Sequence, residues 1–213
     1  MYEALDNFPL RKINFVKTRT TILKAVSYLL KEKNFADITV DEICQRAQIS
    51  RGTFFNYFST KEHVFHYYLR IFTVKIALRI EQWDDEMTFE NKVKQIYDWF
   101  NEQEEYSKFV DSYISFLLNV GENQNEMKLT DAEFVYFFKD IKEEDYTKYN
   151  ALTIQKIFED IAQTAKNKGE IKLEVEQEEL GNLLSGVLVA SYLTDHLQAD
   201  KNHLAIFSKI WNN

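Results

Sequence analysis

Residues 50–62 read SRGTFFNYFSTKE, and this stretch decides the fold. Four aromatic residues fall within five positions there, between the positive charges of Arg51 and Lys61. Two interpretations are open. The stretch is either an ordinary core segment with charged ends, or a short helix whose two faces have different partners.

Hydrophobic spacing ahead of this stretch predicts two helices. In residues 18–34, apolar residues recur every three or four positions, as in an amphipathic helix with one buried stripe. We expect this helix to end at Asn34, because asparagine tolerates the left-handed conformation of a helix C-terminus. Thr39 and Glu42 then form a T-x-x-E capping box, which predicts the start of a helix of two turns.

A break at residues 48–50 separates this helix from the next one. Ser50 is placed to cap a second short helix over residues 51–57. Ser59 and Glu62 repeat the capping-box spacing ahead of a long apolar helix. A short helix, a three-residue turn and a second short helix between two long ones predict a helix-turn-helix with supporting helices.

The helical period divides the aromatic residues of the opening stretch into two groups. At about 100° per residue, Phe54 and Phe58 share one stripe, which predicts that both are core residues. Asn56 falls on nearly the opposite side, and Phe55 and Tyr57 lie on the flanks. Both interpretations of the stretch therefore hold, each for one face of the helix.

The outer face of this helix has the residue types that read a DNA major groove. Arg51 can form two hydrogen bonds with guanine, and Asn56 can do the same with adenine. Phe55 can contact a thymine methyl group, while the hydroxyls of Thr53 and Tyr57 can donate to phosphate. Each residue taken alone is better explained as a solvated surface position, so the arrangement as a whole is the evidence.

The charge distribution agrees with a nucleic-acid partner for the N-terminal part of the chain. The 213 residues carry a net charge of −8. Residues 1–80 nevertheless have 13 Lys and Arg against 7 Asp and Glu, whereas residues 81–213 have 13 against 27. Such asymmetry suggests a basic module attached to an acidic body. Uneven sampling of solvated helix faces is the simpler alternative.

Residues 18–69 resemble the DNA-binding domain of the tetracycline-repressor (TetR) family of bacterial transcription regulators. The matching segments are TRTTILKAV, FADITVDEICQRAQIS and RGTFFNYFSTKEHVF. The last two follow the family patterns T-x-x-x-I-A-x-x-A-G-V-S and x-G-T-L-Y-x-H-F-x-x-K-E. The chain departs from them at Gln48, where the family usually has glycine, at Phe55 for tyrosine and at Tyr57 for histidine. The candidate DNA-contacting residues are Thr39, Arg51, Gly52, Thr53, Phe55, Asn56, Tyr57 and Lys61.

The resemblance implies an all-α protein with two functional parts. An N-terminal arm, residues 1–17, would precede a helix-turn-helix DNA-binding domain, residues 18–62. A larger helical domain for ligand binding and dimerisation would follow, residues 63–213. Its expected helices cover residues 88–103, 106–120, 131–140, 149–168, 174–198 and 202–211.

The family also implies a homodimer and a small-molecule effector. In the family the last two helices form a four-helix bundle across a two-fold axis, although an intrachain core explains the same apolar spacing. The candidate interface residues are Leu180, Leu184, Val187, Leu188, Leu204, Phe207 and Trp211. The aromatic middle of the chain suits an apolar or aromatic effector, although plain core packing is the commoner reason for such residues. The candidate pocket residues are Trp83, Tyr97, Phe100, Tyr113, Phe116 and Phe137.

The sequence lacks the signatures of several other classes of protein. The single cysteine, Cys44, excludes an intrachain disulfide framework, and no apolar run reaches the length of a membrane span, so we expect a cytoplasmic protein. We find no catalytic, metal-binding or cofactor-binding motif and expect no enzyme. The expected function is a repressor that a ligand releases from a palindromic DNA operator. The alternatives are a ligand-independent or partner-controlled DNA-binding factor, and a helical ligand-binding protein without DNA binding.

Overall fold

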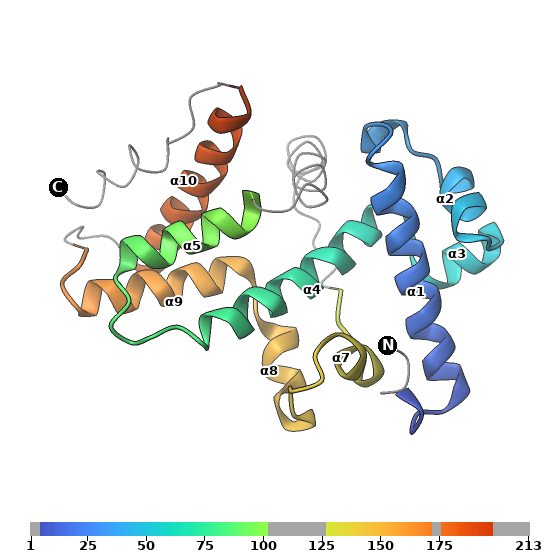
Figure 1. Cartoon of the computed structure of the whole chain (residues 1–213), viewed down its shortest axis with the longest axis horizontal. Helices are drawn as coiled ribbons and strands as arrows, with labels where there is room; N and C mark the ends of the chain where they lie inside the picture. Colours follow the sequence, from blue (N-terminus) through green and yellow to red (C-terminus); the bar gives the residue numbers. More distant parts are fainter. Residues whose placement is uncertain (1–4, 102–126, 172–175, 198–213) are drawn as a thin grey trace. The chain divides into compact units, whose positions relative to one another are not determined.

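The computed structural model describes residues 5–101, 127–171 and 176–197, and all regular structure in these ranges is helical (Figure 1). The predicted all-α fold class is therefore confirmed. The chain forms two compact units, which are discontinuous in sequence. The described part of the first unit comprises residues 5–74 and 127–151, and that of the second comprises residues 75–101, 152–171 and 176–197.

The first unit combines the predicted arm and DNA-binding domain with two short stretches of the predicted regulatory domain. Its helix α1 contacts α2, α3 and α7. The helix α4 continues from this unit into the second one. The elements are α1 (Leu10–Leu29), η2 (Phe35–Asp37), α2 (Val40–Ala47), α3 (Arg51–Tyr57), α4 (Glu62–Ile80), α7 (Asp131–Phe137), η3 (Glu143–Asp145) and α8 (Tyr146–Ala151).

The first helix begins and ends earlier than the sequence predicted. It starts at Leu10, inside the predicted arm, directly after Pro9. It ends at Leu29, and Asn34 has φ −67° and ψ 151°, so the left-handed C-terminus predicted at Asn34 is wrong. The reason is tertiary packing, because Asn34 instead begins the 3-10 turn that brings the ring of Phe35 to within 4.0 Å of the Phe65 ring.

The predicted helix-turn-helix is confirmed at α2 and α3. Thr39 and Glu42 form the expected capping box, and the Ser50 hydroxyl accepts a hydrogen bond from the Thr53 amide. Gln48 ends α2 in the left-handed region, with φ 56° and ψ 44°. Among the described residues it is the only non-glycine residue with a positive φ, which costs about 1 kcal/mol for a side chain other than glycine.

Phe54 and Phe58 anchor α3 in the core of the first unit, as predicted. Both side chains are buried, with 0% and 1% of their surface exposed. The Phe54 ring contacts the Phe58 ring, which in turn contacts the buried ring of Tyr67 on α4. Burying aromatic side chains of this size supplies much of the stability that holds a seven-residue helix in place.

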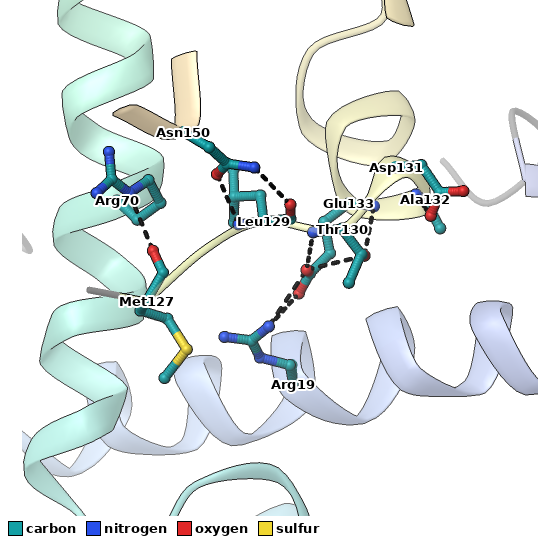
Figure 2. A network of polar contacts seen from close by, with 9 residues as sticks. All are labelled: Arg19, Arg70, Met127, Leu129, Thr130, Asp131, Ala132, Glu133 and Asn150. Carbon is teal, nitrogen blue, oxygen red and sulfur yellow. Dashed lines mark hydrogen bonds and ion pairs between the residues drawn. The ribbon is translucent and has the colours of Figure 1, made fainter. Parts of the chain in front are cut away.

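Residues 127–150 are held in the first unit by buried and partly buried polar contacts (Figure 2). Glu133 of α7 forms an ion pair with Arg19 of α1, at 3.0 Å from Oε1 to Nη1, and both side chains are buried. Arg70 of α4 donates to the Met127 carbonyl at 3.0 Å. Asn150 pairs with both backbone polar groups of Leu129, at 2.8 and 2.9 Å. These contacts join α1, α4, α7 and α8 in one body.

In the second unit, α5 (Phe89–Asn101), α9 (Ile154–Asn167) and α10 (Gln177–Leu197) pack against one another. A Cβ atom added to Gly181 of α10 would lie 2.5 Å from the Glu159 side chain and 3.2 Å from its backbone nitrogen, so glycine permits the close approach to α9. The single helix predicted over residues 149–168 is instead α8 and α9. The chain breaks there because Thr153 is extended and caps α9 with its hydroxyl.

Candidate nucleic-acid interface

The candidate DNA-contacting residues of α3 lie on its outer face. Arg51, Gly52, Phe55 and Asn56 are exposed, and Phe55 keeps 46% of its surface in solvent although it is a large apolar residue. The Phe55 ring also packs edge-on against the buried Phe54 ring, with the ring centroids 5.4 Å apart. The structure thus brings these residues together around a rigid short helix.

Arg51 is the first residue of α3 and forms an ion pair with α2. Its Nη1 lies 2.9 Å from both Oδ1 and Oδ2 of Asp41. The two side chains remain exposed, at 61% for Arg51 and 66% for Asp41. The sequence analysis missed Asp41, because a pair ten residues apart on two helices leaves no local pattern.

Two further candidates on α3 have partners within the first unit. The Thr53 hydroxyl lies 2.9 Å from the Ser50 hydroxyl, at the helix start. The Tyr57 ring packs on Phe15 of α1, with the ring centroids 5.1 Å apart. This contact fixes the direction of the Tyr57 side chain, and Phe15 is a second supporting residue that sequence reasoning missed.

The Lys61 side chain forms hydrogen bonds with the backbone of the segment before α2. Its Nζ donates to the carbonyls of Phe35, Ala36 and Ile38 at 2.9, 3.1 and 2.8 Å, and lies 4.6 Å from the centroid of the Phe35 ring. An ammonium group has three N–H donors, so these three carbonyls can use all of them. Lys61 therefore ties the start of α4 to the loop that leads into α2.

The polar groups of Thr39 form hydrogen bonds at the start of α2. Its hydroxyl accepts from the Glu42 amide and lies 2.9 Å from Glu42 Oε2, which also accepts from the Thr39 amide at 2.9 Å. Hydrogen bonds from Lys33 and then Thr39 lower the pKa of Glu42 from 4.5 to about 2. The capping box is thus stabilised by a charged carboxylate at neutral pH.

The candidate pocket residues do not all lie in the same compact unit. Trp83 and Tyr97 lie in the second unit, where Trp83 Nε1 donates to Gln95 Oε1 at 2.6 Å and Tyr97 is buried. Phe137 lies in the first unit, 6.3 Å from the Tyr67 ring centroid. The side chain of Phe100, and residues Tyr113 and Phe116, lie outside the described part of the structure.

Three of the candidate interface residues are buried within their own chain. Leu180, Leu184 and Val187 on α10 keep at most 6% of their surface, in the unit where α10 packs on α9. Among the described side chains of α10, the exposed large apolar ones are instead Leu183, Val189 and Leu193. The side chain of Leu188, and residues Leu204, Phe207 and Trp211, lie outside the described residues.

The described residues also bear on three other kinds of site: a reactive thiol, a metal site and a membrane-spanning helix. Burial raises the pKa of the Cys44 thiol, which disfavours the reactive thiolate. No group of three or more His, Cys, Asp or Glu side chains in the described ranges could hold a metal ion. The described helices include none with both the length and the hydropathy of a membrane span.

Residues 22–68, which cover α2 and α3 with the end of α1 and the start of α4, match the sequence profile of the family described as "Bacterial regulatory proteins, tetR family". The helix-turn-helix domain is a tetR-family domain. The predicted resemblance is thereby confirmed, and the match spans the exposed face of α3, Asp41 and Lys61. No curated protein sequence matches the chain significantly.

Solved structures with a tetR-type fold resemble most of the chain. A transcriptional regulator of the TetR/AcrR family has a TM-score of 0.55 and 18% identity, over 92% of this chain and 98% of its own. Escherichia coli NemR in its reduced form has a TM-score of 0.54 and 14% identity, over 91% and 97%. Bacillus subtilis FadR, solved with stearoyl-CoA, has a TM-score of 0.52 and 16% identity, over 89% and 93%. These likenesses show that the fold of tetR-family regulators extends beyond the N-terminal domain.

Proposed function

We propose that this protein is a homodimeric, cytoplasmic transcription repressor that binds a palindromic DNA operator through α3 and leaves it when a small molecule binds. The observation that carries the proposal is the exposed face of α3. Arg51, Phe55 and Asn56 are exposed there, while Phe54 and Phe58 anchor the helix in the core. These outer residues offer hydrogen bonds to guanine and adenine and an apolar contact to thymine. The tetR-family match over this region supports the same use.

In the DNA-bound state, the roles divide between base reading and backbone contact. Arg51, Phe55 and Asn56 face base edges, while Thr53 and Tyr57 contact phosphates on either side. Gly52, without a side chain, lets the backbone of α3 come close to the groove. Thr39 and Lys61 lie at the neighbouring helix starts, where amide groups attract phosphate, and they contact DNA after some of their present hydrogen bonds are exchanged.

A dimer is part of the proposal because one short recognition helix buries too little surface for specific binding. Two such helices reach half-sites about 34 Å apart, one turn of the double helix. The exposed residues Leu183, Val189 and Leu193 on α10 supply an apolar surface for the second copy. Leu180, Leu184 and Val187 are buried on the same helix, which packs against α9.

The effector is proposed to be apolar or aromatic and to act by changing which conformation of the dimer is most populated. A ligand shifts that balance only by its differential affinity for the two states. The second unit offers the half-buried Trp83 and the buried Tyr97 as lining residues. FadR, a protein of similar fold, was solved with stearoyl-CoA, a ligand with a long apolar acyl chain. Helix α4, which belongs to both units, is the covalent route from the ligand to α3.

Selection of bound sequences from a random duplex library tests the proposal. The wild-type chain is expected to enrich one palindrome with half-sites about one helical turn apart, and the dimer is expected in sedimentation at the same concentration. Candidate apolar and aromatic compounds are then added to the complex and release is measured. Failure to enrich any sequence, with weak binding that does not depend on salt, would contradict DNA binding by this domain.

A further inference from the structure

The ion pair between Asp41 and Arg51 joins the two helices of the helix-turn-helix on its outer surface. Asp41 is the second residue of α2 and Arg51 the first residue of α3. The Nη1 atom of Arg51 donates to both carboxylate oxygens at 2.9 Å. Both side chains remain mostly in solvent.

This carboxylate lies in the first turn of α2, where the helix dipole favours it only slightly at an exposed position. Exposed ion pairs contribute little to folding, because water already solvates both charges and two side chains lose freedom. The start of α2 is already capped by Thr39 and Glu42, so Asp41 is not needed for that purpose. On a surface that faces DNA, a carboxylate also repels phosphate and lowers affinity. A role of Asp41 in choosing between DNA sequences would explain its position.

The geometry of the pair leaves one edge of the arginine available. The guanidinium group is planar, so fixing Nη1 fixes the direction of Nε and Nη2 as well. Within the described ranges, no hydrogen bond engages Nε or Nη2 of Arg51. The N–H groups of that edge are parallel, which is the arrangement that guanine O6 and N7 accept. An arginine without such a partner can turn its long side chain toward phosphates instead.

We infer that Asp41 is a positioning residue that aims Arg51 at a guanine of the operator and draws it away from phosphate. This inference rests on the proposed function. Asp41 thus lowers affinity for all DNA and raises the preference for one base pair. Arg51 reads the base, and Asp41 acts only through Arg51.

Parallel selections from the random duplex library test the inference, with the wild-type chain, Asp41→Asn, Arg51→Ala and Asp37→Asn. Asp37 is the matched control, because it is an exposed carboxylate of the same domain whose side chain forms no hydrogen bond or ion pair with other described residues. Thermal unfolding by circular dichroism checks that each variant folds. Asp41→Glu is added as the conservative variant, since it keeps the charge but lengthens the side chain.

Arg51→Ala is expected to abolish a guanine preference at one position of each half-site. Asp41→Asn is expected to weaken that same preference by about fivefold, the lower range of what one bidentate contact contributes. Its affinity for random duplex is expected to rise more than that of Asp37→Asn, because the substitution removes a negative charge and also releases Arg51 to contact phosphate. Asp41→Glu should retain part of the guanine preference, since its carboxylate still reaches Arg51.

Three results would overturn the inference. If Asp41→Asn keeps the full guanine preference, Asp41 does not position Arg51. If it changes the preference at another base pair, Asp41 contacts a base itself. If Arg51→Ala leaves a wild-type palindrome unchanged, Arg51 reads no base, so the inference and the proposed base contact of Arg51 fail while operator binding by α3 stands. Absence of any enriched site for the wild-type chain contradicts the proposed function instead, and the inference with it.

Discussion

Glu133 and Arg19, which lie 114 residues apart in sequence, form a fully buried ion pair between α7 and α1. Glu133 also completes the capping box of α7, where its Oε2 accepts from the Thr130 amide at 2.8 Å. The guanidinium of Arg19 lies 3.8 Å from the centroid of the Tyr67 ring and near the rings of Phe15 and Phe58. The first unit therefore depends on one carboxylate for both a helix start and a buried charge.

Removal of that carboxylate is expected to destabilise the first unit strongly. In Glu133→Ala, Arg19 keeps a buried charge without its counterion, which costs about 3–5 kcal/mol when a buried pair is broken. Urea denaturation measures the loss. Asp131→Ala is the matched control on the same helix, because the Asp131–Lys12 pair is exposed and contributes at most about 1 kcal/mol.

The double variant Arg19→Met/Glu133→Leu distinguishes the cost of leaving the Arg19 charge unpaired from the cost of losing the ion pair itself. It is expected to recover most of the stability that Glu133→Ala loses, because no unpaired charge remains in the core. Equal losses in Glu133→Ala and Asp131→Ala would show that the buried pair has no special role.

Phe54 and Phe55 are adjacent on α3, yet their substitutions should have opposite consequences. Phe54→Ala is expected to cost about 3–5 kcal/mol of stability, because it leaves a cavity in the core. Phe55→Ala should change stability by less than about 0.5 kcal/mol but weaken binding to the selected duplex. Urea denaturation and fluorescence anisotropy measure the two effects. Similar stability loss in both variants would contradict the division between the inner and outer faces of α3.

Gln48 adopts a backbone conformation that glycine adopts without strain. Gln48→Gly is therefore expected to raise the free energy of unfolding by about 0.5–1 kcal/mol. Gln45→Gly is the matched control inside α2, where the same substitution should lower stability by about 1 kcal/mol. A loss of stability in both variants would mean that the Gln48 side chain contributes more than its backbone costs.

Acid should remove the stabilising effect of Glu42. The pKa of Glu42 is about 2 in the folded chain, against an ordinary 4.5, so the charged form stabilises the fold. This contribution is fully present above pH 4.5 and is lost as the pH falls toward 2. The difference in unfolding free energy between the wild-type chain and Glu42→Gln is therefore expected to shrink over that range. A difference that stays constant with pH would contradict the depressed pKa.

The parts of the structure that local signals determine could be predicted from the sequence. The boundaries of α2 and α3 follow from Thr39, Glu42 and Ser50, and the burial of Phe54 and Phe58 follows from helical spacing. The C-terminal end of α1 could not be predicted, because tertiary contacts such as the Phe35–Phe65 packing decide it. The break between α8 and α9 coincides instead with a local signal, the capping residue Thr153, which the sequence prediction overlooked. Long-range pairs such as Arg19–Glu133 and Asp41–Arg51 leave no periodic pattern in the sequence.

The ratio of dissociation constants for random and selected duplexes tests the central claim most directly, because it measures whether α3 reads sequence. At one salt concentration, the wild-type chain is expected to bind the selected duplex about a thousandfold or more tightly than random duplex. Asn56→Ala should reduce that ratio by about tenfold, the loss of one bidentate base contact, while Asn91→Ala on the exposed face of α5 leaves it unchanged. A wild-type ratio near one, or equal ratios for the wild-type chain and Asn56→Ala, would contradict recognition of DNA by the outer face of α3.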